Sequence, residues 1–166
     1  MLQIVADTTP LNYLVLIDAA DVLPRIYGRV LIPPSVIAEL SDPLAPQQVR
    51  AWVTQSLPWL HVAHPDAPSD PSLSHLDAGE RDAIALATEQ ASVLLMDERD
   101  GTAVARARGL KVVGTLAVLD VAAVHGWIDL QTMFDRLRQT SFRSPHRLMV
   151  AMLEQDARRK KTPKKI

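Results

Sequence analysis

The chain has 166 residues, of which 48% are apolar and none is cysteine, and its formal net charge is -1. This size and composition predict one folded domain with a core of ordinary size, and the lack of cysteine excludes disulfides, zinc knuckles and thiol nucleophiles. No apolar run approaches the roughly 20 residues of a membrane span, and the N-terminus lacks the basic and then apolar pattern of a signal peptide. We therefore expect a cytoplasmic protein without a membrane partner.

The first half of the chain alternates short apolar runs with segments whose apolar residues recur at helical spacing. The apolar runs predict strands at 2–6, 29–33 and 60–63, and the other segments predict helices at 11–23, 34–42 and 47–57. Residues 64–75 contain three prolines and no periodicity, so we expect a loop there.

The second half repeats this alternation. The predicted strands are 92–96 and 110–114, and the predicted helices are 76–90, 102–108, 115–125, 130–139 and 145–159. Gly109 and Gly126 follow two of these helices, as is typical of C-terminal stops. Alternating strands and helices predict an α/β fold with a mainly parallel central sheet and helices on both faces.

Acidic residues follow two of the predicted strands. Asp7 comes directly after the first strand, and Asp97 and Glu98 come directly after the strand at 92–96. Parallel sheets bind ligands beyond the carboxyl ends of their strands, near the point where strand order reverses. If these two strands are neighbours, we expect their acids to meet at one edge of the sheet.

A structural role for Asp7 is an alternative. Thr8 or Thr9 can cap a helix that has Pro10 as its first residue, and Asp7 would then only complement the helix dipole.

Two glutamates occupy positions near the apolar faces of predicted helices. Glu80 lies in the first turn of the helix at 76–90, on the side of Ala83 and Ile84, but it also has capping-box spacing to Asp77. The capping role and a role in a site need not exclude each other. Glu39 lies at the edge of its helix's apolar stripe, and taken singly it is better interpreted as a surface residue.

Together these acids indicate a particular chemistry. Hard divalent cations such as Mg²⁺ and Mn²⁺ prefer oxygen ligands, and converging carboxylates repel one another unless a cation neutralises them. Such sites hydrolyse phosphodiesters, because the metal lowers the pKa of a water molecule and stabilises charge on the attacked phosphate.

Four segments in this order resemble the PIN-domain ribonucleases: "VADTTPLNYL", "LIPPSVIAEL", "LDAGERDAIALA" and "VLLMDERD". The resemblance covers nearly all of the chain up to about residue 155. The segment "GLKVVGTLAVLDVAAVHGWI" looks like a bacterial and archaeal PIN subgroup of poorly defined function, related to the toxins of toxin–antitoxin pairs.

The resemblance implies which residues form the active site. Carried over residue by residue, it makes the acidic quartet Asp7, Glu39, Glu80 and Asp97. This chain has Glu80 where many members have Asp, and it reads "MDE" where many read Thr-x-Asp. The fourth metal-binding role can therefore fall on Asp97 or on Glu98.

The resemblance also implies a function. We expect a three-layer PIN-like fold and a Mg²⁺- or Mn²⁺-dependent endoribonuclease that cleaves RNA and uses Arg or Lys to hold the RNA backbone. A toxin role with a small antitoxin protein as partner, and a homodimer, follow from the same resemblance. The loop at 64–75 and the last two helices are the candidate partner surfaces.

Two other interpretations remain open. A PIN fold without catalysis could bind protein or RNA. A phosphoacceptor receiver domain also gathers acids at strand ends, but it needs an adjacent acid pair after the first strand, where this chain has Thr8 and Thr9.

The C-terminal end differs from the rest of the chain in charge. The last ten residues hold six of the 18 Lys and Arg and no acid, so the remainder carries 12 basic against 19 acidic groups. We predict a PIN-like domain at 1–156 and a basic, disordered tail at 157–166 that adds salt-dependent RNA affinity.

Overall fold

The computed structural model describes residues 2–68 and 70–162 and confirms the predicted α/β class. Within these residues, five parallel strands form one sheet in the order β3-β2-β1-β4-β5. The strands are β1 (Gln3–Ala6), β2 (Arg29–Ile32), β3 (Leu60–Val62), β4 (Val93–Leu95) and β5 (Val112–Val113). All five predicted strands form and each is shorter than predicted, most of all β5, which has two residues where five were predicted.

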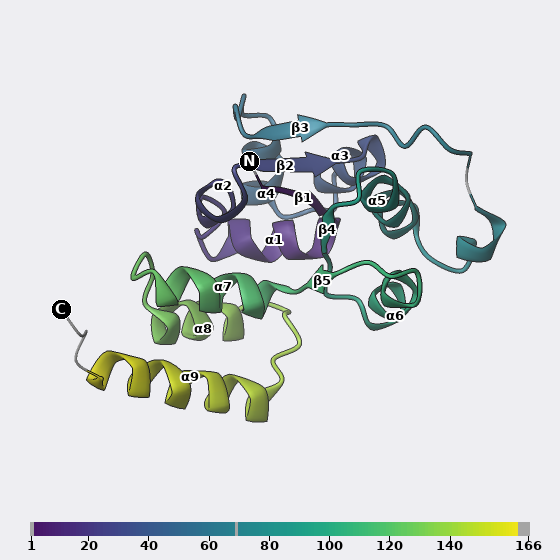
Figure 1. The fold of residues 1–166 in the computed structure, drawn as a ribbon. Coiled ribbons are helices and arrows are strands. Elements are labelled where there is room, and N and C mark those ends of the chain that lie inside the picture. The colour runs from purple at the N-terminus through teal and green to yellow at the C-terminus, as the bar shows by residue number, and fades with distance from the viewer. Residues whose placement is uncertain (1, 69, 163–166) are drawn as a thin grey trace.

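Helices connect the strands and continue beyond the sheet (Figure 1). They are α1 (Thr8–Leu16), α2 (Val22–Tyr27), α3 (Pro34–Leu40), α4 (Gln47–Val53), the short 3-10 helix η1 (Pro71–Leu73), α5 (Ala78–Glu89), α6 (Arg99–Ala107), α7 (Thr115–Val124), α8 (Leu130–Arg138) and α9 (His146–Lys161). The single helix predicted at 11–23 is wrong, because Asp18 adopts a left-handed conformation with φ of 61° and separates α1 from α2.

The alternation of side chains along β1 creates the layers. Ile4 and Ala6 pack into the larger core, which also contains residues of α1, α7 and α8. Val5 points to the opposite face and packs into a second core, which is formed with α5 and α6. The sheet is therefore covered on both faces, as the predicted three-layer fold requires.

The order of the strands positions the acidic residues. Strand β1 pairs with β2 on one side and with β4 on the other, so strand order reverses between β1 and β4. The backbone N–H of Asp7 donates to the Leu95 carbonyl at 3.0 Å, which extends this pairing past the end of β1. The prediction that these two strands are neighbours is confirmed.

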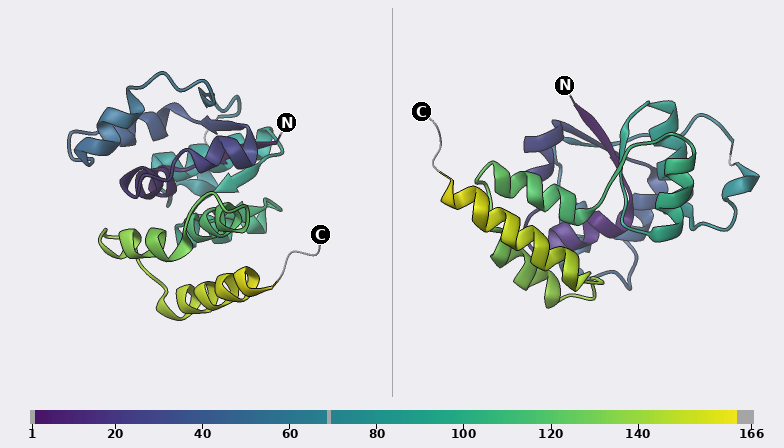
Figure 2. Two further views of the ribbon diagram at one scale, coloured as in Figure 1. Left: turned by 90° about the vertical axis from the view of Figure 1, so that its left-hand side faces the viewer. Right: turned by 60° about the horizontal axis from the view of Figure 1, so that its bottom comes forward.

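Helix α9 forms an outer layer against α7 and α8 (Figure 2). It continues to Lys161, so the prediction of disorder is wrong for residues 157–161, and the helix crosses the predicted domain boundary after residue 156. Residues 163–166 of the predicted tail lie outside the described residues. In the described part of the chain, no helix is both long and apolar enough to cross a membrane.

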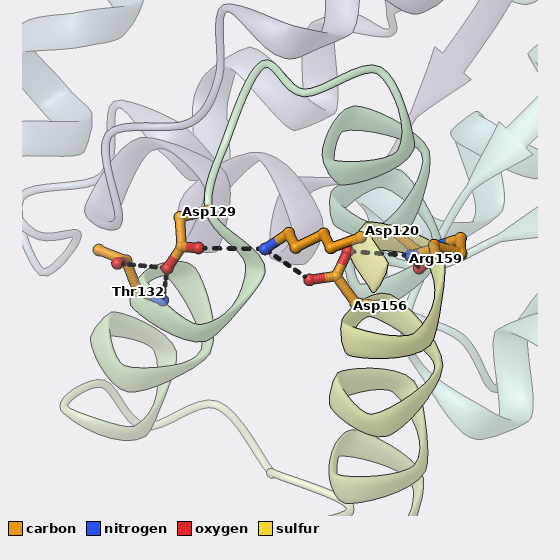
Figure 3. A network of polar contacts seen from close by, with 6 residues as sticks. Asp120, Asp129, Thr132, Asp156 and Arg159 are labelled. Carbon is orange, nitrogen blue, oxygen red and sulfur yellow. Dashed lines mark hydrogen bonds and ion pairs between the residues drawn. The ribbon is translucent and has the colours of Figure 1, made fainter. Parts of the chain in front are cut away.

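A network of ion pairs explains why this basic segment is helical (Figure 3). The buried carboxylate of Asp156 accepts from Arg159 at 3.2 Å and from Lys160 at 2.9 Å. Arg159 also lies 2.8 Å from Asp120 of α7. Cations in the last turn of a helix are stabilised by the helix dipole. The basic residues therefore fasten α9 to its neighbours.

Candidate functional site

Asp7 lies at the centre of the candidate site, where β1 ends and α1 begins. Its side chain is 2% exposed and makes no capping hydrogen bond to α1. Its Oδ1 atom is buried and has no hydrogen-bond partner among the described residues. Helix α1 starts at Thr8, so the predicted helix start at Pro10 is wrong. No capping contact accounts for this buried carboxylate.

The surroundings of Asp7 disfavour its charged form. Burial is the main cause that raises the pKa of Asp7 from its usual 3.8 to about 8, although the Thr8 amide opposes the rise. The negative charges of Asp77, Glu80 and Glu39 raise this pKa further. The site is therefore an electrostatic environment in which a carboxylate takes up a proton or a cation.

Glu39 is held between two other segments of the site. Its Oε2 atom accepts a hydrogen bond from the Thr8 hydroxyl, and its Oε1 atom accepts one from the backbone N–H of Gly79 at 3.0 Å. Glu39 is half-buried, so the interpretation of this residue as a surface glutamate is wrong. These contacts bring α3 and the start of α5 to the end of β1.

Gly79 makes this contact possible, and the sequence analysis missed it. A Cβ atom on Gly79 would lie 2.6 Å from Glu39 Oε2, closer than a side chain can approach without moving the carboxylate. The available signal was a glycine in the first turn of a predicted helix, where it has no capping function.

Glu80 has the predicted capping role and also joins the acidic group. The N–H of Glu80 donates to Asp77 Oδ1 at 2.8 Å, and the N–H of Asp77 donates to Glu80 Oε2 at 3.3 Å, which confirms the capping box. Glu80 is 8% exposed. Burial, followed by the charges of Asp77, Glu98 and Glu39, raises the pKa of Glu80 to about 7, against the effect of the Asp77 amide.

Asp97 and Glu98 are neighbours in the sequence but differ in their contacts and in their exposure to solvent. Asp97 accepts hydrogen bonds from the N–H of Thr115 at 2.8 Å and from the Thr115 hydroxyl at 2.5 Å, so it holds the start of α7. Burial raises the pKa of Asp97, and the Thr115 bonds oppose the rise. Glu98 is exposed at the N-cap of α6, and its charge acts on Glu80. The structure thus brings Asp7, Glu39 and Glu80 together, with Glu98 on the Glu80 side.

Thr115 was also missed by the sequence analysis as a partner of Asp97. A hydroxyl residue directly after a strand and at the start of a helix was the signal that could have found it.

The carboxylates are not arranged as a finished metal site. In residues 2–68 and 70–162, no group of three or more His, Asp or Glu side chains is placed so that it could hold a metal ion. Glu39 is held by Thr8 and Gly79, and Glu80 is held by its capping box. The unpartnered Asp7 Oδ1 and the oxygen-only donor set nevertheless fit a hard divalent cation.

Comparison with protein families identifies the class of this molecule. The family model DUF3368, described as a PIN domain, matches residues 3–158. Because this match covers nearly the whole chain, the chain belongs to the PIN-domain family, as the sequence resemblance indicated. PIN domains are generally nucleases that use divalent metal ions. No curated protein shows significant sequence similarity to the chain.

Proposed function

We propose that this protein is a Mg²⁺- or Mn²⁺-dependent endoribonuclease whose cation is held by Asp7, Glu39 and Glu80. The observation that carries the proposal is the buried Oδ1 atom of Asp7, which has no hydrogen-bond partner among the described residues. A buried carboxylate oxygen without a partner is costly to keep in a structural role. Its retention among other acids is explained if a cation binds there.

The donor set supports the choice of metal. The acids offer only carboxylate oxygens, which suit Mg²⁺ or Mn²⁺ better than softer metals. A bound cation would lower the pKa of a water molecule and stabilise charge on the attacked phosphate. Glu39 and Glu80 could turn toward Asp7 only by exchanging their present contacts with Thr8, Gly79 and the Asp77 amide.

The fourth carboxylate of the quartet remains a choice between two residues. The charge that Glu98 exerts on Glu80 supports Glu98 as the fourth metal-binding residue. The two hydrogen bonds from Thr115 support a positioning role for Asp97, which would keep α7 beside the site.

Substitution of Glu80 by Gln tests the proposal. Glu80→Gln keeps the side-chain length and the capping contact to Asp77, but it removes a charge that the cation requires. We expect the fold to survive while Mn²⁺ affinity, measured by calorimetry, and cleavage of a fluorescent RNA fall together. Glu154→Gln, an exposed change on α9, is the matched control. Retention of both properties by Glu80→Gln would exclude Glu80 from the metal site.

A non-catalytic RNA-binding module is the second candidate. It is favoured by the lack, among residues 2–68 and 70–162, of a side-chain group already placed to hold a metal ion. RNA binding by the wild-type protein without cleavage in the presence of Mn²⁺ would support this second function over the first.

A toxin role is a further part of the proposal. PIN domains can pair with antitoxins, and α9 carries exposed apolar residues such as Leu148 and Val150 that a small antitoxin or a second copy could cover. Expression of the wild type should arrest growth of a bacterial host, and expression of Asp7→Asn should not. Light scattering on the purified protein tests the homodimer.

A further inference from the structure

A cavity of about 570 Å³ adjoins the acidic edge of the sheet. It lies between the starts of α1, α6 and α7 and the segment that connects α8 to α9. In Figure 1 this connecting segment lies at the ends of α8 and α9 that are nearer to β5. The lining residues used below are Tyr13, Asp97, Glu98, Arg99, Phe142 and Arg143. Its volume is in the range of small-molecule binding sites.

The cavity carries opposite charges on different parts of its wall. Asp97 and Glu98 belong to the acidic edge, whereas Arg99 and Arg143 supply two guanidinium groups. Neither arginine forms an ion pair with the residues that the structure describes. Arg99 is the first residue of α6, whose N-cap makes no side-chain hydrogen bond to the helix. The two arginines favour a phosphate, and they do so against the negative charges of Glu98 at the N-cap and Asp100 in the first turn of α6.

An aromatic pair forms another part of the wall. The rings of Tyr13 and Phe142 meet edge to face, with centroids 5.1 Å apart and an angle of 81°. The Tyr13 hydroxyl lies 3.0 Å from Ser141 Oγ, and the Phe142 N–H donates to Thr140 Oγ1 at 3.1 Å. The connecting segment is therefore held against α1, and this aromatic pair lines the same cavity as the two arginines.

We infer that this cavity is a nucleotide subsite for a single-stranded RNA substrate. An unpaired base would stack against Phe142 and Tyr13, and its phosphate would lie between Arg99 and Arg143. The neighbouring phosphodiester would then reach the carboxylates of the candidate active site. The inference rests on the proposed function for its ligand. A base in a duplex is paired and stacked, so the subsite requires an unpaired strand at the cleavage point.

Binding of RNA without cleavage tests the subsite. The full chain is titrated in EDTA against a fluorescein-labelled single-stranded RNA of about ten nucleotides, a length within the range that single-strand grooves hold.

Phe142→Leu keeps the apolar packing against Tyr13 and removes the aromatic face, so we expect about a fivefold or larger loss of affinity. Arg143→Gln should lose several-fold and flatten the salt dependence of binding. Arg106→Gln, an exposed arginine of α6 outside the cavity, is the control and should change affinity less than about twofold.

The possible outcomes separate this inference from the proposed function. The subsite is overturned if the protein binds the single strand and its duplex with equal affinity. It is also overturned if both Phe142→Leu and Arg143→Gln keep wild-type affinity, or if the wild-type protein binds no RNA. If the binding pattern holds but Mn²⁺ produces no cleavage, the proposed ribonuclease function fails and the subsite stands. If RNA is cleaved while both variants keep their affinity, only the subsite fails.

Discussion

Asp7 and Asp156 are both buried aspartates, with 2% and 5% of their surface exposed, but their surroundings differ. Asp156 accepts from Arg159 and Lys160 on its own helix, and Arg159 also pairs with Asp120 of α7. Asp7 has one carboxylate oxygen without a partner, and the charges nearest to it are negative. The carboxyl group of Asp156 therefore stabilises the fold, whereas that of Asp7 weakens it.

This difference separates structural acids from functional ones. A buried charge that is paired with cations needs no further explanation, because its partners replace the water that it lost. A buried acid among like charges is retained at the expense of stability, and such groups concentrate at functional sites.

The largest expected effect comes from Asp7→Asn. The change removes the central ligand of the proposed metal site, so we expect RNA cleavage to fall by about 100-fold or more. It also removes a carboxyl group whose charged form is disfavoured by burial and then by Asp77, Glu80 and Glu39, so the melting temperature of the metal-free protein should stay equal or rise. Cleavage of a fluorescent RNA and a thermal melt measure the two effects. A loss of several degrees would show that Asp7 is a structural residue.

Asp156→Asn is the matched control at the paired aspartate. It should leave cleavage unchanged and lower the free energy of unfolding by about 1–3 kcal/mol, because Arg159 and Lys160 lose their shared partner. Urea unfolding measures this loss.

The pH dependence of stability offers a second way to distinguish the two sites. The pKa of Asp7 is about 8 in the folded protein, whereas an unperturbed aspartate has a pKa of 3.8. The folded state therefore holds a proton that the unfolded chain releases. The contribution of this bound proton to the free energy of unfolding is complete below about pH 4. It decreases by up to about 1.4 kcal/mol per pH unit as the pH rises, and it is lost above about pH 8. Urea unfolding in EDTA should show wild type losing stability relative to Asp7→Asn between pH 5 and 8, on the order of a few kcal/mol. A constant difference across this range would contradict the raised pKa.

Gly79→Ala should separate site geometry from stability. The new Cβ would lie 2.6 Å from Glu39 Oε2 and displace that carboxylate. We expect cleavage to fall about tenfold, while the free energy of unfolding changes by less than about 1 kcal/mol, since alanine favours a helix more than glycine does. In a Glu39→Ala background the same change should have no further effect on cleavage. Additive losses would show that Gly79 acts through another residue.

The smallest expected effects distinguish Asp97 from Glu98. Asp97→Asn should weaken the hydrogen bonds to Thr115 and lower the free energy of unfolding by about 0.5–2 kcal/mol. Glu98→Gln should leave unfolding unchanged and lower Mn²⁺ affinity measured by calorimetry. The reverse pattern would make Asp97 the fourth metal-binding residue.

Local patterns were sufficient to predict the layers and the position of the acidic edge. Short apolar runs predicted all five strands, and Asp7 could be placed beside β4 because parallel strands end at the same edge. The Asp77–Glu80 capping box was also predictable, because both partners belong to one helical turn. In each case the deciding interaction is local or follows from sheet geometry.

Contacts between distant segments could not be predicted in the same way. Gly79 is needed because of Glu39, which lies 40 residues away, and Thr115, which lies 18 residues from Asp97, binds it from the start of α7. Residues 157–161 have the composition of a disordered tail, but Asp120 of α7 and Asp129 before α8 supply partners for their cations. Pairing across the fold thus overrides the local composition.

Stabilisation of the folded protein by Mn²⁺ tests the central claim most directly. A cation that binds the folded state at Asp7 must raise its melting temperature, and above the dissociation constant the stabilisation grows with the logarithm of the cation concentration. We predict that Mn²⁺ raises the melting temperature of the wild type and of Asp156→Asn, and that Asp7→Asn shows no such rise. An equal rise in all three proteins, or no rise in any of them, would contradict the assignment of the buried Asp7 carboxylate to a metal site.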